Sequence, residues 1–191
     1  GLLLPRVTQL SHRGDSKALL HLTIRVGRIQ FYVITLIFFG FVILGQDFLR
    51  LWVGDNFNNT YYVVLLLIGT NIVSLTQQVT SDLVLAENKV RYTATLTFVT
   101  SGLALLGSIF LAPTMGAVGC ALSFFIAMCI NIILLNIFYK NTLGVNVSEF
   151  FYQCHIKLLP VTIIVNVVFF AIKQFVVTDK WSALILFGLI Y

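Results

Sequence analysis

Charged residues are scarce in this chain of 191 residues, and their scarcity decides its class. Lys, Arg, Asp and Glu make up 10% of the sequence and hydrophobic residues 59%, whereas a soluble domain is about 25% charged and about half apolar. A soluble core could not hide so much apolar surface. The composition therefore excludes an ordinary soluble domain and indicates an integral membrane protein.

Patterns typical of catalytic and metal sites are also missing. The three cysteines, Cys120, Cys129 and Cys154, have no CxxC or Cys/His spacing, so neither a disulfide framework nor a metal site is predicted. The three histidines, His12, His21 and His155, have no Cys or Asp nearby in a catalytic spacing, and we expect them to be solvated or interfacial. We expect no catalytic residue, no metal and no cofactor, and we do not expect an enzyme.

Long uncharged runs, in contrast, are abundant and give the number of transmembrane helices. A helix needs about 20 mostly apolar residues to cross roughly 30 Å of hydrocarbon. The runs predict passes at residues 29–45, 61–79 and 158–177, and two more within 92–139. That last run is too long for one crossing, and Pro113 and Gly116 near its middle predict a hairpin of two helices.

Both ends of the chain resemble interrupted helices. Residues 1–5 read as the end of a preceding helix, residues 181–191 begin a further pass, and no signal-peptide pattern is present. We therefore expect a fragment of an all-α, polytopic transmembrane bundle, with five full passes and a truncated helix at each end. Its expected segments are a helix end with a basic interfacial helix (1–28), four transmembrane helices (29–139), a cytoplasmic connection (140–157) and additional C-terminal helices (158–191).

Basic residues gather on one side of this predicted topology. Nine lie on one side, namely Arg6, Arg13, Lys17, Arg25, Arg28, Lys89, Arg91, Lys140 and Lys157, and three on the other, namely Arg50, Lys173 and Lys180. Cytoplasmic loops near helix ends retain an excess of Lys and Arg, so the side with nine is expected to be cytoplasmic. The net charge of +5 follows mainly from this asymmetry. It predicts contact with anionic lipid headgroups and no nucleic-acid partner.

Residues 16–28 combine basic and apolar residues at helical spacing. One face carries the basic group Lys17, His21, Arg25 and Arg28. The segment predicts an interfacial helix that enters the membrane. Two interpretations of its basic face remain open: anchoring to anionic lipid, worth about 1 kcal/mol per basic residue, or recognition of a phosphorylated lipid substrate.

A polar row follows one face of the second predicted pass. Its members recur at i, i+3, i+7 and i+11 and are Asn71, Ser74, Gln78 and Asp82, with Gln77 and Ser81 beside them. Polar side chains within a membrane either hydrogen-bond to neighbouring helices or line an aqueous cavity. The sequence leaves these two interpretations open and predicts only that the row avoids lipid.

Small residues recur every four positions in the fourth predicted pass. The row consists of Gly119, Ser123, Ala127 and Asn131. Small residues let two helix backbones approach closely, so this row predicts packing. Asparagines at 131, 136 and 166 are expected to form interhelical hydrogen bonds.

Several short motifs occur in a distinctive order. They are LPR at 4–6 ending a helix, the basic helix, LWVGDNF at 51–57, VLAENKVR at 84–91 and MGAVGCA at 115–121. This order resembles the polysaccharide transporter family of bacterial lipid-linked oligosaccharide (O-antigen) flippases, in the multidrug, oligosaccharidyl-lipid and polysaccharide exporter superfamily. The resemblance spans essentially the whole chain.

The resemblance implies a two-bundle, alternating-access transporter of the bacterial inner membrane, of which this chain is the C-terminal part. The expected partners are the bilayer, the N-terminal bundle of the same protein and a polyprenyl-diphosphate-linked oligosaccharide used for surface polysaccharide. By resemblance, Arg6, Arg25 and Arg28 would meet the diphosphate, and Asn71, Gln77 and Gln78 would meet sugar hydroxyls.

Other functions remain open. A cation-coupled multidrug exporter of the same superfamily usually needs an intramembrane carboxylate, and none lies in the predicted passes. A membrane polysaccharide polymerase or ligase is expected to carry a long outer loop with catalytic residues, whereas the predicted outer connections are short. A structural membrane subunit would also account for rows of polar and small residues.

Overall fold

The computed structural model describes residues 3–54, 58–174 and 188, and their regular structure is helical throughout. The elements are α1 (Leu4–His12), α2 (Ser16–Val53), α3 (Asn58–Thr76), α4 (Gln78–Ala86), α5 (Val90–Leu143), α6 (Val147–Phe151), the π-helix η2 (Tyr152–Ile156) and α7 (Leu159–Lys173). The predicted all-α fold is confirmed for these residues.

Among the described residues, four helices are long and apolar enough to cross a membrane. They are Ser16–Val53, Asn59–Thr76, Val90–Leu143 and the combined run Val147–Lys173. Large apolar side chains lie exposed along them, for example Phe98 at 82% and Ile164 at 64%. Such surfaces fit contact with lipid, so the chain has the features of a multi-pass membrane protein. The further pass expected from residue 181 lies outside the described residues.

Helix α2 joins two segments that the sequence analysis separated. Asp15 caps its start, because the Asp15 carboxylate accepts the Ala18 N–H at 3.0 Å. The helix then continues for 38 residues to Val53, a length of about 57 Å at 1.5 Å per residue. The basic segment 16–28 and the first pass are therefore one helix. Since this exceeds the roughly 30 Å of hydrocarbon, the basic end extends beyond the apolar layer.

The start of the chain differs from its prediction. Leu4, Pro5 and Arg6 were expected to end a helix, but they form the first turn of α1, which continues to His12. Proline fits this turn because the N–H it lacks would have no helical partner there. The motif therefore begins the described helix.

The predicted hairpin is confirmed within α5. Two arms reverse at Gly116, whose φ of 58° and ψ of −138° are open mainly to glycine. The arms are joined where the Ser123 hydroxyl donates to the Ala104 carbonyl at 2.7 Å. All four members of the small-residue row at 119–131 are buried, which confirms their predicted packing role.

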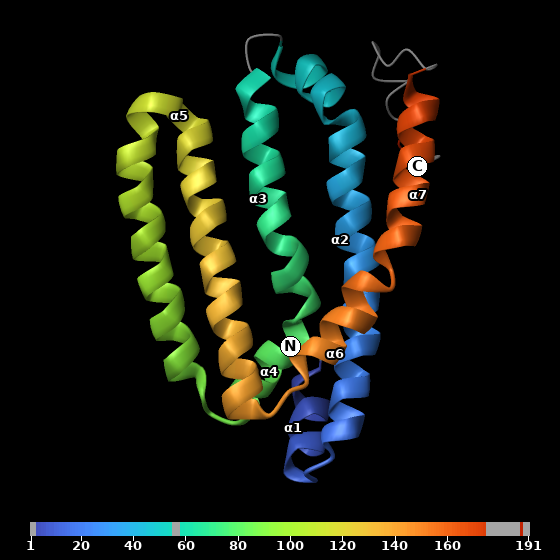
Figure 1. Cartoon of the computed structure of the whole chain (residues 1–191), viewed down its shortest axis with the longest axis vertical. Coiled ribbons are helices and arrows are strands. Elements are labelled where there is room, and N and C mark those ends of the chain that lie inside the picture. Colours follow the sequence, from blue (N-terminus) through green and yellow to red (C-terminus); the bar gives the residue numbers. More distant parts are fainter. Residues whose placement is uncertain (1–2, 55–57, 175–187, 189–191) are drawn as a thin grey trace.

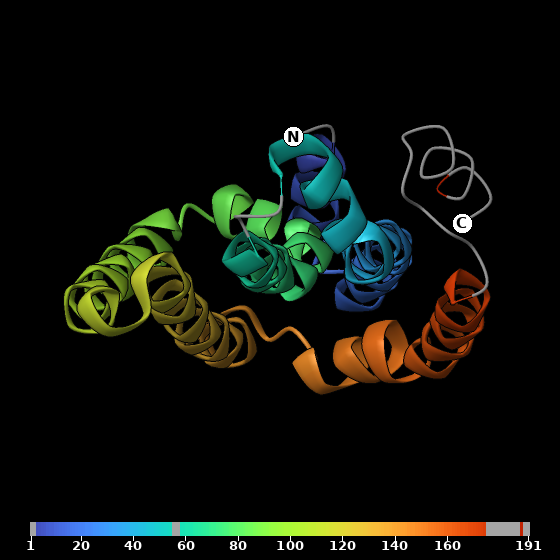
Figure 2. The same ribbon diagram turned by 90° about the horizontal axis from the view of Figure 1, so that it is seen from above.

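The helices form a curved row in which sequence neighbours are mostly spatial neighbours (Figure 1). Seen from above, the α5 hairpin lies at one end of the row and α7 at the other, with α2 and α3 between them (Figure 2). Helices α1, α4 and α6 gather at one end of the bundle. Near the opposite end, Lys173 Nζ on α7 lies 3.0 Å from Asp47 Oδ2 on α2. Lys173, one of the three basic residues on the side with fewer of them, therefore pairs with a carboxylate.

Candidate functional site

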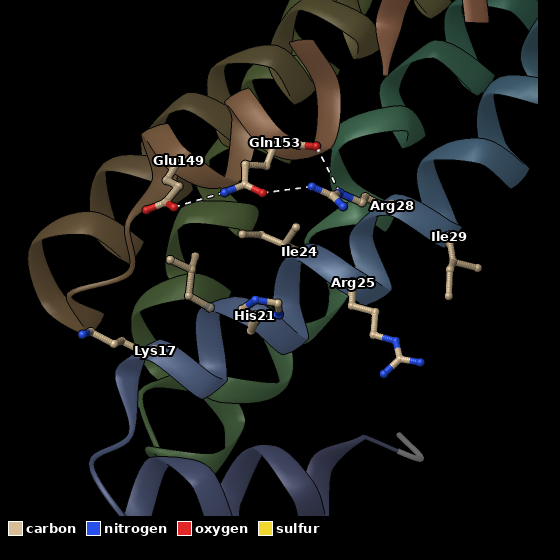
Figure 3. A pocket seen from close by; sticks show the side chains of 9 residues that line it. Lys17, His21, Ile24, Arg25, Arg28, Ile29, Glu149 and Gln153 are labelled. Atoms are coloured by element: carbon tan, nitrogen blue, oxygen red, sulfur yellow. Dashed lines mark hydrogen bonds between the residues drawn. The ribbon is translucent and has the colours of Figure 1, made fainter. Parts of the chain in front are cut away.

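A groove between α2 and the α6–η2 segment gathers the basic face of α2 (Figure 3). Its volume is about 770 Å³, and we call it the basic groove. It is lined by Lys17, Leu20, His21, Ile24, Arg25, Arg28, Ile29, Glu149 and Gln153. Two of the expected diphosphate-binding residues, Arg25 and Arg28, therefore line one groove. The third, Arg6, lies exposed on α1.

A chain of hydrogen bonds fixes Arg28 in this groove. Asn146 caps α6, because its side-chain oxygen accepts the Glu149 N–H at 3.2 Å. The Glu149 carboxylate accepts from the Gln153 amide at 3.1 Å. Arg28 Nη2 donates to the Gln153 side-chain oxygen at 2.9 Å, and Arg28 Nε donates to the Gln153 carbonyl at 3.3 Å. The Arg28 guanidinium is thus oriented before any ligand binds.

Gly27 allows the α6–η2 segment to pack directly on α2. A Cβ at this position would lie 2.8 Å from Cys154 Sγ, 2.9 Å from the Phe150 ring and 2.9 Å from the Thr76 carbonyl oxygen. The Cys154 thiol also donates to the Ile24 carbonyl at 3.7 Å. Four elements, namely α2, α6, η2 and the end of α3, therefore meet at Gly27, where α2 has no side chain.

His155 belongs to this junction, so of its two expected roles, solvated or interfacial, the solvated one is wrong. Its Nε2 lies 3.3 Å from the Thr76 hydroxyl. Its ring stacks on Phe151 and meets the edge of Phe31, with ring centroids 4.9 and 5.0 Å away. His155 was expected in a cytoplasmic connection, whereas it lies within the packed helical segment η2. Its role in the described structure is to hold η2 against α2 and α3.

The charges of the basic groove do not cancel. Three basic side chains, Lys17, Arg25 and Arg28, share the lining with one carboxylate, Glu149. The direct partner of Arg28 is the neutral Gln153, so its positive charge is oriented without being neutralised. Arg25 is exposed and points away from Gln153 (Figure 3). The groove therefore offers a fixed guanidinium beside mobile basic side chains, an arrangement that suits an anion with several oxygens.

The predicted polar row is divided by a break at Gln77. Helix α3 ends at Thr76 and α4 starts at Gln78, with Gln77 between them at φ −97° and ψ 16°. Asn71 and Gln78 are exposed, as are the hydroxyl residues Ser74 and Ser81. Asp82 and Gln77 are buried at 6% exposure each. Of the three expected sugar-binding residues, only Asn71 and Gln78 are free to meet a ligand in this structure.

Gln77 instead makes a contact between helices. Its side-chain amide donates to the Asn136 side-chain oxygen at 2.6 Å, and Asn136 donates in turn to the Ile132 carbonyl at 2.8 Å. The bond ties the α3–α4 break to the second arm of α5. Asn136 is thus confirmed as an interhelical hydrogen-bonding residue.

Replacing Gln77 by leucine is expected to destabilise the bundle by about 1–3 kcal/mol, because the Asn136 oxygen then loses its buried donor. The thermal midpoint of the purified protein in detergent measures this effect. The double variant Q77L/N136L should lose less than the sum of the two single variants, because no polar partner is left unsatisfied. Additive losses would mean that the two side chains do not interact.

Two residues of the basic groove were not predicted, although the sequence carries a local signal for them. Glu149 and Gln153 fall in a segment that was expected to be a cytoplasmic connection. Asn146 followed three residues later by Glu149 is typical of a helix start, and Glu149 and Gln153 are four apart, as neighbours on a helix are. Within the described residues, no three His, Cys, Asp or Glu side chains are grouped to hold a metal ion.

Comparison with known proteins adds no relative. No family model, no curated protein and no solved structure matches the chain. The features of the chain that bear on its function are the basic groove, the exposed part of the polar row and the order of the sequence motifs.

Proposed function

We propose that the chain is part of a flippase that carries a polyprenyl-diphosphate-linked oligosaccharide across a bacterial inner membrane for surface polysaccharide synthesis. The observation that supports this proposal most directly is the exposure of Asn71, Ser74 and Gln78 along α3 and α4, beside exposed apolar side chains such as Leu67 and Leu75 on α3. The order of the sequence motifs supports the same family.

The physical argument starts from the transported group. An oligosaccharide cannot cross hydrocarbon unaided, because each unsatisfied polar group costs several kcal/mol. A transporter must therefore offer hydrogen-bonding side chains in a wet cavity. Asn71 lies within the membrane-span candidate Asn59–Thr76, and its amide nitrogen donates to the Leu67 carbonyl at 2.9 Å. This bond orients the amide of an exposed residue, whose oxygen is then available to accept from a sugar hydroxyl.

In this proposal the exposed polar residues face a second helical bundle across the cavity. Such residues would be unfavourable against lipid, so either water or another protein surface must cover them. Alternating access between two bundles would expose the cavity to one side of the membrane at a time. The proposed partner is the N-terminal bundle of the same protein. Transport requires both bundles, so it is a property of the complete transporter.

A cation-coupled exporter is the second candidate, and Asp82 is the observation that favours it. Asp82 is buried, and its Oδ2 has no hydrogen-bond partner among the described residues. A buried carboxylate of this kind suits a coupling cation. Asp82 lies on α4, however, which is not among the helices long enough to cross the membrane. The flippase therefore remains the better-supported proposal.

Deletion of the gene that encodes this chain tests the proposal. We expect loss of surface polysaccharide and accumulation of its polyprenyl-linked precursor in the cytoplasmic leaflet, measured by the accessibility of the glycan to an impermeant labelling reagent. Normal surface glycan with altered resistance to cationic drugs would favour the exporter. Precursor that is outward-facing but not polymerised would favour a polymerase or ligase.

A further inference from the structure

We propose that the basic groove binds the phosphodiester headgroup of an anionic membrane phospholipid, and that one acyl chain of this lipid follows α2 into a second groove beside α7. The ligand is a resident of the bilayer and not the transported glycolipid. The inference concerns lipid binding and does not depend on the proposed transport function.

The headgroup part of the proposal follows from the charges and their orientation. Arg28 is held by two hydrogen bonds to Gln153, while Lys17 and Arg25 remain exposed at the same groove. A phosphodiester presents acceptor oxygens to both a fixed guanidinium and flexible cations. Glu149 is the one carboxylate in the lining, and its bond to Gln153 gives it a positioning role.

Apolar residues make the groove suit a lipid better than a soluble anion. Leu20 and Ile24 lie between basic residues along α2, and Ile29, which follows Arg28, is 61% exposed. A free phosphate gains nothing from such walls, whereas the glycerol and first methylenes of a lipid bury apolar surface against them. The combination of oriented positive charge and apolar lining is typical of lipid headgroup sites.

A second groove continues the path along α2. It has a volume of about 150 Å³ and is lined by Tyr32, Thr35, Leu36, Val161, Thr162, Val165 and Asn166. Leu36 follows Arg28 by eight residues, a rise of about 12 Å along the helix. Ile29 in the basic groove and Tyr32 in the second groove are both exposed and lie three residues apart on α2. A lipid with its phosphate at Arg28 can therefore place a hydrocarbon chain between α2 and α7.

The positions of the two grooves separate this lipid from the transported substrate. The basic groove is formed by α2, α6 and η2, whereas the exposed polar residues proposed for sugar binding lie on α3 and α4. Helix α2 is longer than the hydrocarbon layer is thick, so its basic end lies outside that layer, at the level of the phospholipid headgroups. A bound lipid would link α2 to α6 and α7 and stabilise their packing by mass action.

The full-length protein, purified in a neutral detergent, tests the proposal by native mass spectrometry and by thermal midpoint. The probes are dioleoylphosphatidylglycerol, dioleoylphosphatidylcholine, a polyprenyl monophosphate and glycerol 3-phosphate. We expect phosphatidylglycerol to be retained and to raise the thermal midpoint, phosphatidylcholine to do so weakly, and glycerol 3-phosphate not to compete. The double variant K17Q/R25Q should bind phosphatidylglycerol about thirtyfold more weakly, because two basic contacts are lost.

The matched control is R13Q/R91Q, which removes the same charge at two exposed residues outside the groove and should bind like the unmodified protein. Equal losses in both double variants, or equal binding of the two phospholipids, would overturn the proposal. Competition by glycerol 3-phosphate would overturn the proposal by showing that the groove binds free anions. Retention of polyprenyl phosphate alone would overturn it by assigning the groove to the transported glycolipid. If K17Q/R25Q does not fold, the four probes on the unmodified protein still decide between these outcomes.

Discussion

Replacing Asn71 and Gln78 together by leucine is expected to lower glycan export by tenfold or more while leaving the bundle folded. Each amide offers hydrogen bonds to sugar hydroxyls, and a neutral hydrogen bond contributes about 1 kcal/mol, so the loss of two or more reaches roughly tenfold to a hundredfold. Both side chains are exposed, so leucine creates no packing conflict at either position. Export is measured as surface polysaccharide in cells that carry the complete transporter, after membrane insertion has been checked.

The matched control uses two exposed polar residues on another helix. Thr97 and Ser101 lie on the first arm of α5, away from α3 and α4, and the variant T97L/S101L should export normally. Unimpaired export by N71L/Q78L in a properly inserted protein would remove the cavity interpretation. The exposed polar residues would then be assigned to contacts between helices, as a structural subunit would require.

Replacing Gly27 by leucine is expected to cause the largest loss of stability of any single change considered. A Cβ there meets Cys154 Sγ at 2.8 Å and the Thr76 carbonyl oxygen at 2.9 Å, and the second contact is backbone that cannot rotate away. Overpacking of this kind lowers the free energy of unfolding by about 1–3 kcal/mol, and by more where the backbone must move. For a chain of this size, 3 kcal/mol corresponds to roughly 6–12 °C in Tm.

The consequence reaches the basic groove, because Gly27 lies where η2 packs on α2. Forcing the two apart should break the Arg28–Gln153 bonds and weaken phospholipid binding together with stability. Gly102, in the first arm of α5, is the matched position, since a Cβ there meets nothing within 4 Å. G102L should therefore be nearly neutral. Equal shifts in Tm for G27L and G102L would mean that the close approach at Gly27 does not hold the fold.

Much of the fold could be predicted because the bilayer imposes local requirements. A spanning helix must satisfy its own backbone and present a long apolar surface, and both properties can be recognised in a single segment of sequence. The α5 hairpin follows from a run too long for one crossing, interrupted by Pro113 and Gly116. The small residues from Gly119 to Asn131 repeat at helical spacing, so their burial was also visible in advance.

The candidate site was only partly predictable. The basic face of α2 is a local pattern, and Arg25 and Arg28 were found from it. Gln78 was placed in the polar row and Gln77 beside it, and both were assigned to sugar binding by resemblance. The break between α3 and α4 instead buries Gln77 against Asn136 and leaves Gln78 exposed. A periodicity analysis assumes one uninterrupted helix, so it cannot detect a break that depends on packing.

The sequence by itself determined that the chain is helical with helices apolar enough to cross a membrane, where these helices lie, and which face of α2 is basic. The tertiary structure decided that the basic segment and the first pass form one helix, that Gln77 is structural, and that Glu149 and Gln153 complete the basic groove. The physical reason is distance along the chain: composition and periodicity act over a few turns, whereas the Arg28–Gln153 bond joins residues 125 apart. Such a contact exists only once Gly27 has allowed η2 to pack against α2.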